Sequence, residues 1–229
     1  MRSIVDEELV RRRATRARRA ILVGMVVLIA ATVLSFNPKY LLPAYGMIIP
    51  GVIVAGWGTR TAEKWLQEPR VDQMLSKALK GLPQAYRLYS YLLPSEQVIL
   101  APSGLFVLRA KGQGGRITCQ GDRWHRPFSI GRLLSRVREH RLGNPTRQVR
   151  AEADKVRRLL STQLPGVDVP IQPIVVFTNP DVELTVLEPT VPAMLLSDLK
   201  AHLREASKVQ GLAKQAHGAV LDLFEAQMR

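Results

Sequence analysis

The fold is decided by the stretch Glu96-Gln-Val-Ile-Leu-Ala-Pro-Ser-Gly-Leu-Phe-Val-Leu-Arg-Ala-Lys111 and its continuation Gly112-Gln-Gly-Gly-Arg-Ile-Thr-Cys-Gln-Gly-Asp-Arg-Trp124. Residues 98–100 and 105–108 are short apolar runs rich in strand-forming residues, and residues 101–104 between them have turn chemistry. This pattern predicts a β-hairpin. A further run at 116–120 follows the glycine-rich turn, which predicts a meander of three sequential strands.

The middle strand of this meander ends on two basic residues, Arg109 and Lys111. Alternate residues of a strand point to the same face of a sheet. We therefore expect the two cations to lie side by side on one face.

Length and composition limit the class of protein. With 229 residues the chain has room for one globular domain of ordinary size plus an appendage. Its single cysteine, Cys119, excludes an intrachain disulfide, and its four histidines have neither zinc-finger nor His-Glu-x-x-His spacing. We therefore expect reducing surroundings, no structural metal and no small-molecule cofactor.

The charge of the chain points to an anionic partner. A net charge of +14 favours nucleic acid or a membrane surface. Residues 96–150 hold eleven lysines and arginines against three acids, whereas residues 151–229 hold eight against ten. The positive charge of the domain is thus concentrated around the stretch that decides the fold.

The N-terminal part has the pattern of a membrane hairpin. Seven arginines lie in residues 1–19. Two uncharged apolar segments, 20–36 and 40–57, come next and are separated by Asn37-Pro38-Lys39. Segments of this length are suited to span a hydrocarbon core of about 30 Å. We predict a basic segment at 1–19, a transmembrane helical hairpin at 20–57 and a juxtamembrane linker at 58–70. A cleaved signal peptide and a buried helical hairpin are the alternatives.

The distribution of basic residues also predicts the orientation of this hairpin. Six arginines between residues 11 and 19 precede the first span, and Arg60, Lys64 and Arg70 follow the second. Such residues concentrate on the cytoplasmic side of membrane proteins. We therefore expect a two-span protein of the cell membrane, with both termini and the domain at 71–229 in the cytoplasm.

The remainder of the chain predicts an α/β domain with a mixed central sheet flanked by helices. We expect helices at 71–82, from Asn144-Pro145 onward, from Ser197-Asp198 to 206 and at 212–224, with strands at 85–93, 171–177 and 182–187. The helix that begins at residue 144 has an apolar face made by Val149, Ala153, Val156, Leu160 and Leu164. Residues 125–143 are expected to form a short helix or a mobile insertion.

The order helix, three-stranded meander, helix, strand resembles the core of the restriction-endonuclease-like fold. More specifically, the chain resembles the NERD family, the nuclease-related domain, over about residues 71–178. The segments that carry this resemblance are Pro102-Ser-Gly-Leu-Phe-Val-Leu108, Gly115-Arg-Ile117, Trp124, Asn144-Pro-Thr-Arg-Gln148 and Ile174-Val-Val-Phe177. The resemblance implies a bacterial protein, and family members are sometimes tethered to membrane helices.

The resemblance also implies a nuclease site. In the family and in the wider PD-(D/E)xK nucleases, an acid opens the second strand and Glu-x-Lys closes the third, where the carboxylates bind a divalent metal. The resemblance places the acid at Glu96 and the lysine at Lys111, and it matches a family glutamine with Gln148. Arg109 stands where the family has its metal-binding glutamate, and Asp72 is the other candidate acid. A guanidinium cannot ligate Mg²⁺, so the resemblance implies a degenerate site.

Arg109 permits a second interpretation, in which the old catalytic cleft has become an anion pocket made by Arg109, Lys111 and Arg116. Arginine can bind phosphate through two hydrogen bonds. The expected nucleic-acid contacts are Arg109, Lys111, Arg116 and Arg126. Trp124 and Phe128 are candidates to stack on bases, although burial in the core is the alternative for Trp124. For the basic residues the alternative is ordinary solvated charge, and for Gln148 it is a surface polar side chain. Asp122 is expected to be a solvated surface acid.

Three functions are compatible with these patterns. The first is a membrane-tethered module that binds nucleic acid and has little or no nuclease activity. The second is an active nuclease that uses Mg²⁺ and an atypical set of acids. The third is a membrane-bound scaffold whose basic face lies on anionic lipid.

Overall fold

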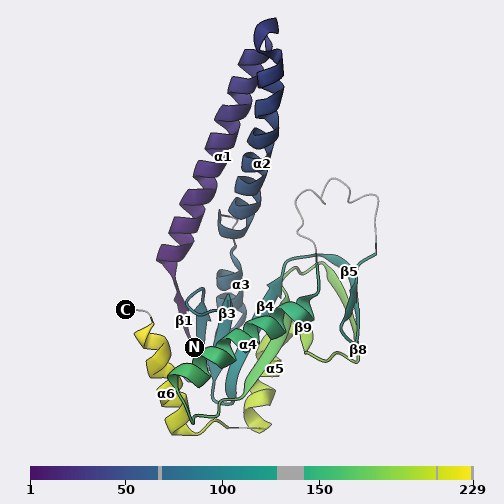
Figure 1. The fold of residues 1–229 in the computed structure, drawn as a ribbon. Coiled ribbons are helices and arrows are strands. Elements are labelled where there is room, and N and C mark those ends of the chain that lie inside the picture. The colour runs from purple at the N-terminus through teal and green to yellow at the C-terminus, as the bar shows by residue number, and fades with distance from the viewer. Residues whose placement is uncertain (67–68, 128–141, 210, 228–229) are drawn as a thin grey trace. The chain divides into compact units, whose positions relative to one another are not determined.

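A computed structural model describes residues 1–66, 69–127, 142–209 and 211–227 (Figure 1). The chain divides into two compact units, one made of Met1–Val5 together with Val71–Arg229 and the other of Asp6–Arg70. The smaller unit is therefore an insertion between the first five residues and the rest of the larger unit.

The larger unit contains both strands and helices. In chain order they are β1 (Arg2–Val5), α3 (Val71–Ala78), β2 (Arg87–Ser90), β3 (Gln97–Ala101), β4 (Gly104–Lys111), β5 (Gly115–Gln120), β6 (Arg123–His125), α4 (Pro145–Gln163), β7 (Ile171–Phe177), β8 (Val182–Leu187), β9 (Ala193–Leu195), α5 (Leu196–Val209) and α6 (Lys214–Ala226). The predicted helices and strands of the domain are all present within one to a few residues of their expected ends. The main shift at a helix start is that α5 begins at Leu196, so Ser197 and Asp198 lie inside its first turn.

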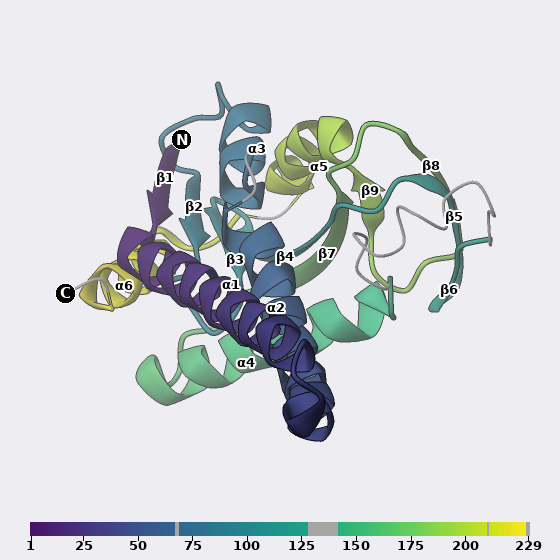
Figure 2. The same cartoon turned by 90° about the horizontal axis from the view of Figure 1, so that it is seen from above.

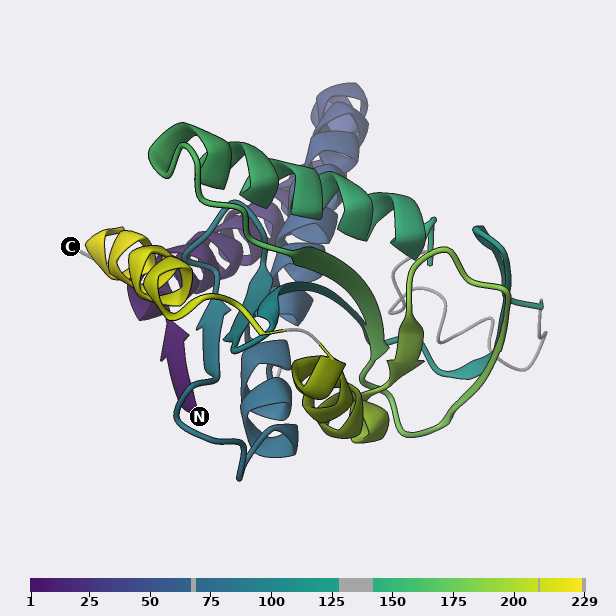
Figure 3. The ribbon, with the colours of Figure 1, turned by 90° about the horizontal axis from the view of Figure 1, so that it is seen from below.

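The central sheet has six strands in the order β1-β2-β3-β4-β7-β9. Strands β2, β3 and β4 are antiparallel neighbours, whereas β4 pairs with β7, and β7 with β9, in parallel. The sheet is therefore mixed, and helices lie on both of its faces, as Figure 3 shows with α4 and α5 on opposite sides. The predicted fold class is confirmed.

Each face of this sheet carries its own apolar core. On one face the strands pack against α4 and α6, and the largest buried residues there include Tyr89, Leu105, Val107, Phe177 and Phe224. On the other face they pack against α3 and α5, through residues such as Leu75, Leu88, Phe106, Leu108 and Leu203. Alternation along β4 thus sends Leu105 and Val107 to the α4 face, and Arg109 and Lys111 continue that alternation.

The predicted hairpin is confirmed as β3 and β4. Ala101 and Gly104 are opposite each other at its turn, and Gly104 has φ +133. A Cβ at Gly104 would lie 2.5 Å from the carbonyl oxygen of Pro170. Only glycine suits this turn, because both the backbone conformation and the close approach of the neighbouring chain exclude a side chain.

The prediction that residues 116–120 form the third strand of the meander is wrong. Residues 115–120 form β5, which belongs to a separate sheet of order β6-β5-β8 and pairs with β8 in parallel. The reason is that β7 already occupies the free edge of β4, from Leu105 opposite Ile171 to Lys111 opposite Phe177. The three-stranded meander of this fold is instead β2-β3-β4.

Strand β1 is a feature that the sequence did not predict. Arg2–Val5 lies at the edge of the central sheet and pairs with β2 in parallel, with Ile4 opposite Tyr89. The terminal amine of Met1 donates a hydrogen bond to the carbonyl oxygen of Leu82 at 2.8 Å. The five residues that precede the hairpin are therefore part of the domain that follows it.

The smaller unit is a helical hairpin of α1 (Glu7–Ser35), the short 3₁₀ helix η1 (Pro38–Tyr40) and α2 (Leu41–Leu66), seen from above in Figure 2. The buried residues of α1 recur every seventh position, at Val10, Ala17, Gly24 and Ala31. A seven-residue repeat is the signature of two helices that supercoil around each other. A Cβ at Gly24 would lie 2.6 Å from the backbone nitrogen of Ala55, so glycine is needed where the two helices approach each other at this point.

Beyond the arginines at the start of α1, the hairpin exposes many apolar side chains. Leu22, Val26, Ile29, Val33, Leu42, Ile49 and Ile53 are among its exposed side chains. Two stretches, Glu7–Ser35 and Pro38–Thr59, are long and apolar enough to cross a membrane by length and composition.

Candidate functional site

Helix α4 places two polar side chains over the end of β4. The helix begins where the sequence predicted, since the Asn144 side chain accepts a hydrogen bond from the backbone amide of Arg147 at 2.9 Å and Pro145 takes the first helical position. Its apolar face, with Val149 and Val156 fully buried, fixes the rotation of the helix against the sheet. Gln148 and Glu152, one turn apart, consequently face the strand end that carries Arg109 and Lys111.

Arg109 lies between two carboxylates. Its Nη1 donates to Oε1 of Glu152 at 2.6 Å and lies 3.3 Å from Oε1 of Glu96. The second oxygen of Glu152 accepts a hydrogen bond from the Ser95 hydroxyl at 3.1 Å. The side chains of Arg109 and Glu152 are 24% and 12% exposed, so this ion pair is largely withdrawn from water. We refer to Ser95, Glu96, Arg109 and Glu152 as the Arg109 cluster.

Lys111 lies beside this cluster and is also paired within the protein. Its Nζ donates to Oε1 of Gln148 at 2.8 Å and to the carbonyl oxygen of Leu142 at 3.0 Å. The residue is only 7% exposed. Burial, assisted by the charge of Arg109, lowers the pKa of Lys111 to about 8. Lys111 is thus a buried, hydrogen-bonded amine and not a solvated strand end.

The two cations and the two acids balance one another. Burial raises the pKa of the Glu152 carboxyl, and the neighbouring charge of Arg109 opposes that rise. A buried carboxylate of this kind is stable only when it is paired with a cation. Glu152 and Arg109 therefore stabilise each other. Together, Glu96, Arg109, Lys111 and Glu152 present no net positive charge to an incoming anion.

The residues at this site do not fit a divalent metal. Magnesium takes oxygen ligands and usually one or two carboxylates. Here the guanidinium of Arg109 contacts both nearby carboxylates and so occupies the position at which a cation would bind them. No group of three or more His, Cys, Asp or Glu side chains with metal-binding geometry is present within the described ranges.

The structure brings together four of the residues singled out in the sequence and separates the others. Glu96, Arg109, Lys111 and Gln148 meet as described above. Arg116 lies in the second sheet, where its exposed side chain is 3.3 Å from Glu183, so the expected pocket of Arg109, Lys111 and Arg116 does not form. The remaining candidates lie elsewhere: Asp72 is buried on α3, across the sheet from α4, and Arg126 follows β6.

Glu152 and Ser95 are the members that sequence reasoning missed. Glu152 follows Gln148 by four residues, and residues at that spacing lie on one face of a helix. Once the helix at 144 and the family glutamine had been assigned, this spacing was a usable signal. Ser95 has no such signal, because its role depends on how the loop before β3 meets α4.

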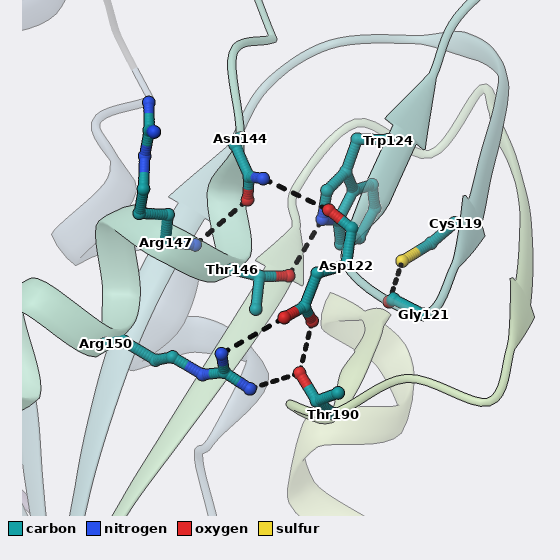
Figure 4. Close-up of polar contacts among 9 residues, drawn as sticks. All are labelled: Cys119, Gly121, Asp122, Trp124, Asn144, Thr146, Arg147, Arg150 and Thr190. Atoms are coloured by element: carbon teal, nitrogen blue, oxygen red, sulfur yellow. Dashed lines mark hydrogen bonds and ion pairs between the residues drawn. The ribbon is translucent and has the colours of Figure 1, made fainter.

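A second polar network joins β6 to the start of α4 (Figure 4). The indole nitrogen of Trp124 donates to the Thr146 hydroxyl at 2.8 Å, and the Asn144 side-chain amide donates to the carbonyl oxygen of Asp122 at 3.1 Å. The Asp122 carboxylate also pairs with Arg150 at 3.0 Å and accepts a hydrogen bond from the Thr190 hydroxyl. Asp122 is thus a structural member of the fold and not a solvated surface acid.

The two aromatic residues proposed to stack on bases have different outcomes. Trp124 is half-buried, with its ring centroid 5.7 Å from that of Phe177, which favours the core alternative. Phe128 lies outside the described residues, as does most of the segment 125–143. The expectation of a short helix or mobile insertion there stays a prediction.

Comparison with known protein families agrees with this geometry. A family model described as the nuclease-related domain, NERD, matches residues 63–178. The matched range includes the Arg109 cluster, Lys111, Gln148 and strands β2 to β7. No curated protein and no solved structure matches the chain.

Proposed function

Because the chain belongs to the NERD family, the nuclease-related domains, we propose that it is a membrane-anchored member that binds nucleic acid and has lost nuclease chemistry at Arg109. The observation that carries this proposal is the contact of 2.6 Å between Arg109 and Glu152. It supports the proposal because it holds a fixed positive charge between Glu152 and Glu96.

The electrostatics of this substitution oppose metal-dependent hydrolysis. A unit charge 4 Å from another contributes about 4 kcal/mol at an effective dielectric of about 20, and a divalent ion doubles that figure to about 8 kcal/mol. An arginine cannot relieve the repulsion by losing its proton. Without a bound metal to activate water and stabilise the leaving oxygen, phosphodiester hydrolysis loses its main source of rate enhancement.

Nucleic-acid binding is proposed at exposed basic residues of the same end of the domain. Arg109 and Lys111 are engaged by Glu152 and Gln148, so their effect on a phosphate is indirect. Arg116 and Arg123 lie on exposed positions of β5 and β6, and Arg147 is exposed in the first turn of α4. The surface ion pair of Arg116 with Glu183 is weak enough for a phosphate to compete with it. Arg126, which is half-buried, is the fourth candidate.

The proposed membrane anchor is supported by the two apolar helices, and the pairing of β1 with β2 constrains its topology. This pairing joins residues before the hairpin to residues after it in one sheet, so both must lie on the same side of any membrane. An even number of spans meets that condition, and α1 and α2 provide two candidates. The arginines at the start of α1 favour the cytoplasm for that side.

A second candidate function is supported by the presence of both Glu96 and Glu152 around Arg109. If Arg109 moved away, two carboxylates would remain next to Lys111 and Gln148, which is the content of an atypical nuclease site. Incubation of the full-length protein in detergent with labelled DNA and RNA, with and without Mg²⁺ or Mn²⁺, separates the two functions. We expect binding without cleavage. Metal-dependent cleavage that Glu152→Gln abolishes would establish the second candidate.

A further inference from the structure

The start of α1 carries a dense group of arginines. We call Arg11, Arg12, Arg13, Arg16, Arg18 and Arg19 the arginine collar. All six side chains are exposed. Among the side chains that the structure describes, Arg12 alone has a carboxylate partner, Glu8, and that pair is itself exposed. Among the described side chains, the collar is therefore a cluster of six exposed arginines with one carboxylate partner.

The collar surrounds the helix on every side except its packed seam. At about 100° per residue, the six positions cover the circumference apart from an arc that contains Val10, Ala14 and Ala17. Val10 and Ala17 are buried, so this arc is the face used for packing. The arginines are thus presented outward around the helix and do not form a stripe directed at one protein surface.

The position of the collar along α1 is at the level of lipid headgroups when the apolar segment is in a bilayer. Arg19 directly precedes the uncharged run that begins at Ala20. Arg11 lies about 13 Å earlier, given a rise of about 1.5 Å per residue. The polar layer of a bilayer adds about 5 to 8 Å beyond the hydrocarbon on each side. The last three arginines therefore lie within that layer, and the first three lie within about one Debye length of it.

The collar opposes helix formation unless anions are present. Arg12 and Arg16, Arg13 and Arg16, and Arg16 and Arg19 are neighbours at three or four residues, and each such like-charge pair destabilises a helix by a few tenths of a kcal/mol. In the described part of α1, Glu7 and Glu8 are the acids that precede these arginines, and the sequence has no further acid before Glu63. An external anion between the arginines removes this repulsion.

We propose that the arginine collar is a binding site for the phosphate groups of anionic glycerophospholipids in the membrane leaflet that the hairpin enters. This inference rests on the membrane-anchor part of the proposed function. Guanidinium groups bind phosphate through two hydrogen bonds, and clusters of four to eight basic residues next to a span are suited to anionic lipid. Nucleic acid is the less suitable occupant, because its phosphates would have to approach a negatively charged membrane surface closely.

The test uses the full-length protein in nanodiscs of phosphatidylglycerol and phosphatidylcholine. The lipids that stay bound after release from the disc are identified by native mass spectrometry. We expect the wild type to retain phosphatidylglycerol preferentially. Replacement of Arg11, Arg13, Arg16, Arg18 and Arg19 by glutamine should remove the preference, and each single replacement should weaken it about fivefold, which corresponds to about 1 kcal/mol per basic residue. Both leaflets of a nanodisc have the same lipid composition, so the lipid preference of a variant with inverted topology is still measured correctly.

Matched variants separate charge, position and anchoring. The same five positions changed to lysine should keep most of the preference, whereas Arg116→Gln, Arg123→Gln and Arg147→Gln in the domain should leave it unchanged. A milder variant, Arg13→Gln with Arg16→Gln, guards against misfolding of the five-residue variant and should show an intermediate preference. Equal retention of the two lipids by the wild type overturns the proposal, as does a full preference in the five-glutamine variant. If the wild type does not enter discs of phosphatidylcholine alone, the membrane anchor has failed instead.

Discussion

Arg109 on β4 and Glu152 on α4 form an ion pair, with Nη1 and Oε1 separated by 2.6 Å. The pair joins the central sheet to the helix that covers one of its faces. The family resemblance implies a metal-binding acid at this strand position. In this chain the position carries a positive charge, and a helix residue supplies the compensating negative charge.

The first prediction concerns the strength of this pair. Glu152→Gln leaves the guanidinium of Arg109 with the more distant Glu96 and should lower the free energy of unfolding by about 2 kcal/mol, less than the loss of a fully buried partner. Thermal unfolding of the detergent-solubilised protein measures the effect. Asp154→Asn on the exposed side of α4 is the matched control and should change stability by less than about 0.5 kcal/mol. Equal stability of Glu152→Gln and the wild type would show that the pair contributes nothing.

The second prediction is that a metal site can be regained. Arg109→Glu alone adds a third carboxylate beside Glu96 and Glu152, so it should be less stable than the wild type without metal. Its melting temperature should then rise on addition of Mn²⁺, because the ion binds the folded state alone. The wild type should show no such rise. If neither Arg109→Glu nor its combination with Glu152→Gln responds to Mn²⁺ or Mg²⁺, ligands other than residue 109 are missing.

The third prediction is a pH dependence from Lys111. Its pKa is about 8 in the folded protein, below the ordinary value of 10.5. Between these two values the unfolded chain binds more protons at this residue than the folded one does, so stability should increase with pH across that window. The gain for a shift of this size is about 3 kcal/mol as an upper estimate. Lys111→Met should lack this rise, whereas the exposed Lys155→Met should keep it, and identical pH profiles for all three proteins would contradict the assignment.

The fourth prediction concerns the edge strand. Ile4 packs against the core on the α4 face, so Ile4→Asp should destabilise the domain by about 2 to 3 kcal/mol. Ser3→Thr, at an exposed position of the same strand, should be close to neutral. Hydrogen exchange of the β2 amides reports whether the strand has detached. Unchanged protection of β2 in Ile4→Asp would mean that β1 contributes little to the sheet.

The fifth prediction tests the nucleic-acid surface. Phosphate contacts make binding depend on salt, with a log-log slope of about 0.9 per phosphate neutralised on duplex DNA. Arg116→Gln and Arg147→Gln should each weaken binding on all sequences and flatten the slope by roughly one unit. Arg158→Gln, exposed on α4 about three turns from Arg147, is the control. A slope that no domain variant alters would place the contacts elsewhere on the chain.

Much of the domain was predictable because its signals are local. The turn at 101–104, the cap at Asn144 and the apolar run of β7 each predict one element without reference to distant residues. The placement of β5 was not predictable in this way. Strand β5 cannot pair with β4 because β7, about sixty residues later in the chain, already pairs with that edge of β4. No property of residues 116–120 indicates this pairing.

The site was predictable only as a set of positions. The family pattern identified Glu96, Arg109, Lys111 and Gln148, and the structure places these four together. The carboxylate that neutralises Arg109 is set by the rotation of α4 against the sheet. The sequence pattern of β4 alone does not predict that rotation. Strand β1 was missed for a related reason, since four residues before a charged helix have no periodicity to detect and acquire their conformation from β2.

The place of β1 in the sheet sets an order of events during synthesis. Strand β1 leaves the ribosome before the hairpin, but its partner β2 ends at Ser90, eighty-five residues after Val5. At about 5 to 20 residues per second, the strand waits for roughly 4 to 17 seconds. Both helices of the hairpin are made during this interval. On the proposed two-span anchoring, a nascent chain inserts its anchor while the first strand is still unpaired. The edge of the sheet can close only when residues on either side of the hairpin are in the same compartment, and a chain inserted with a single span would be unable to complete its domain.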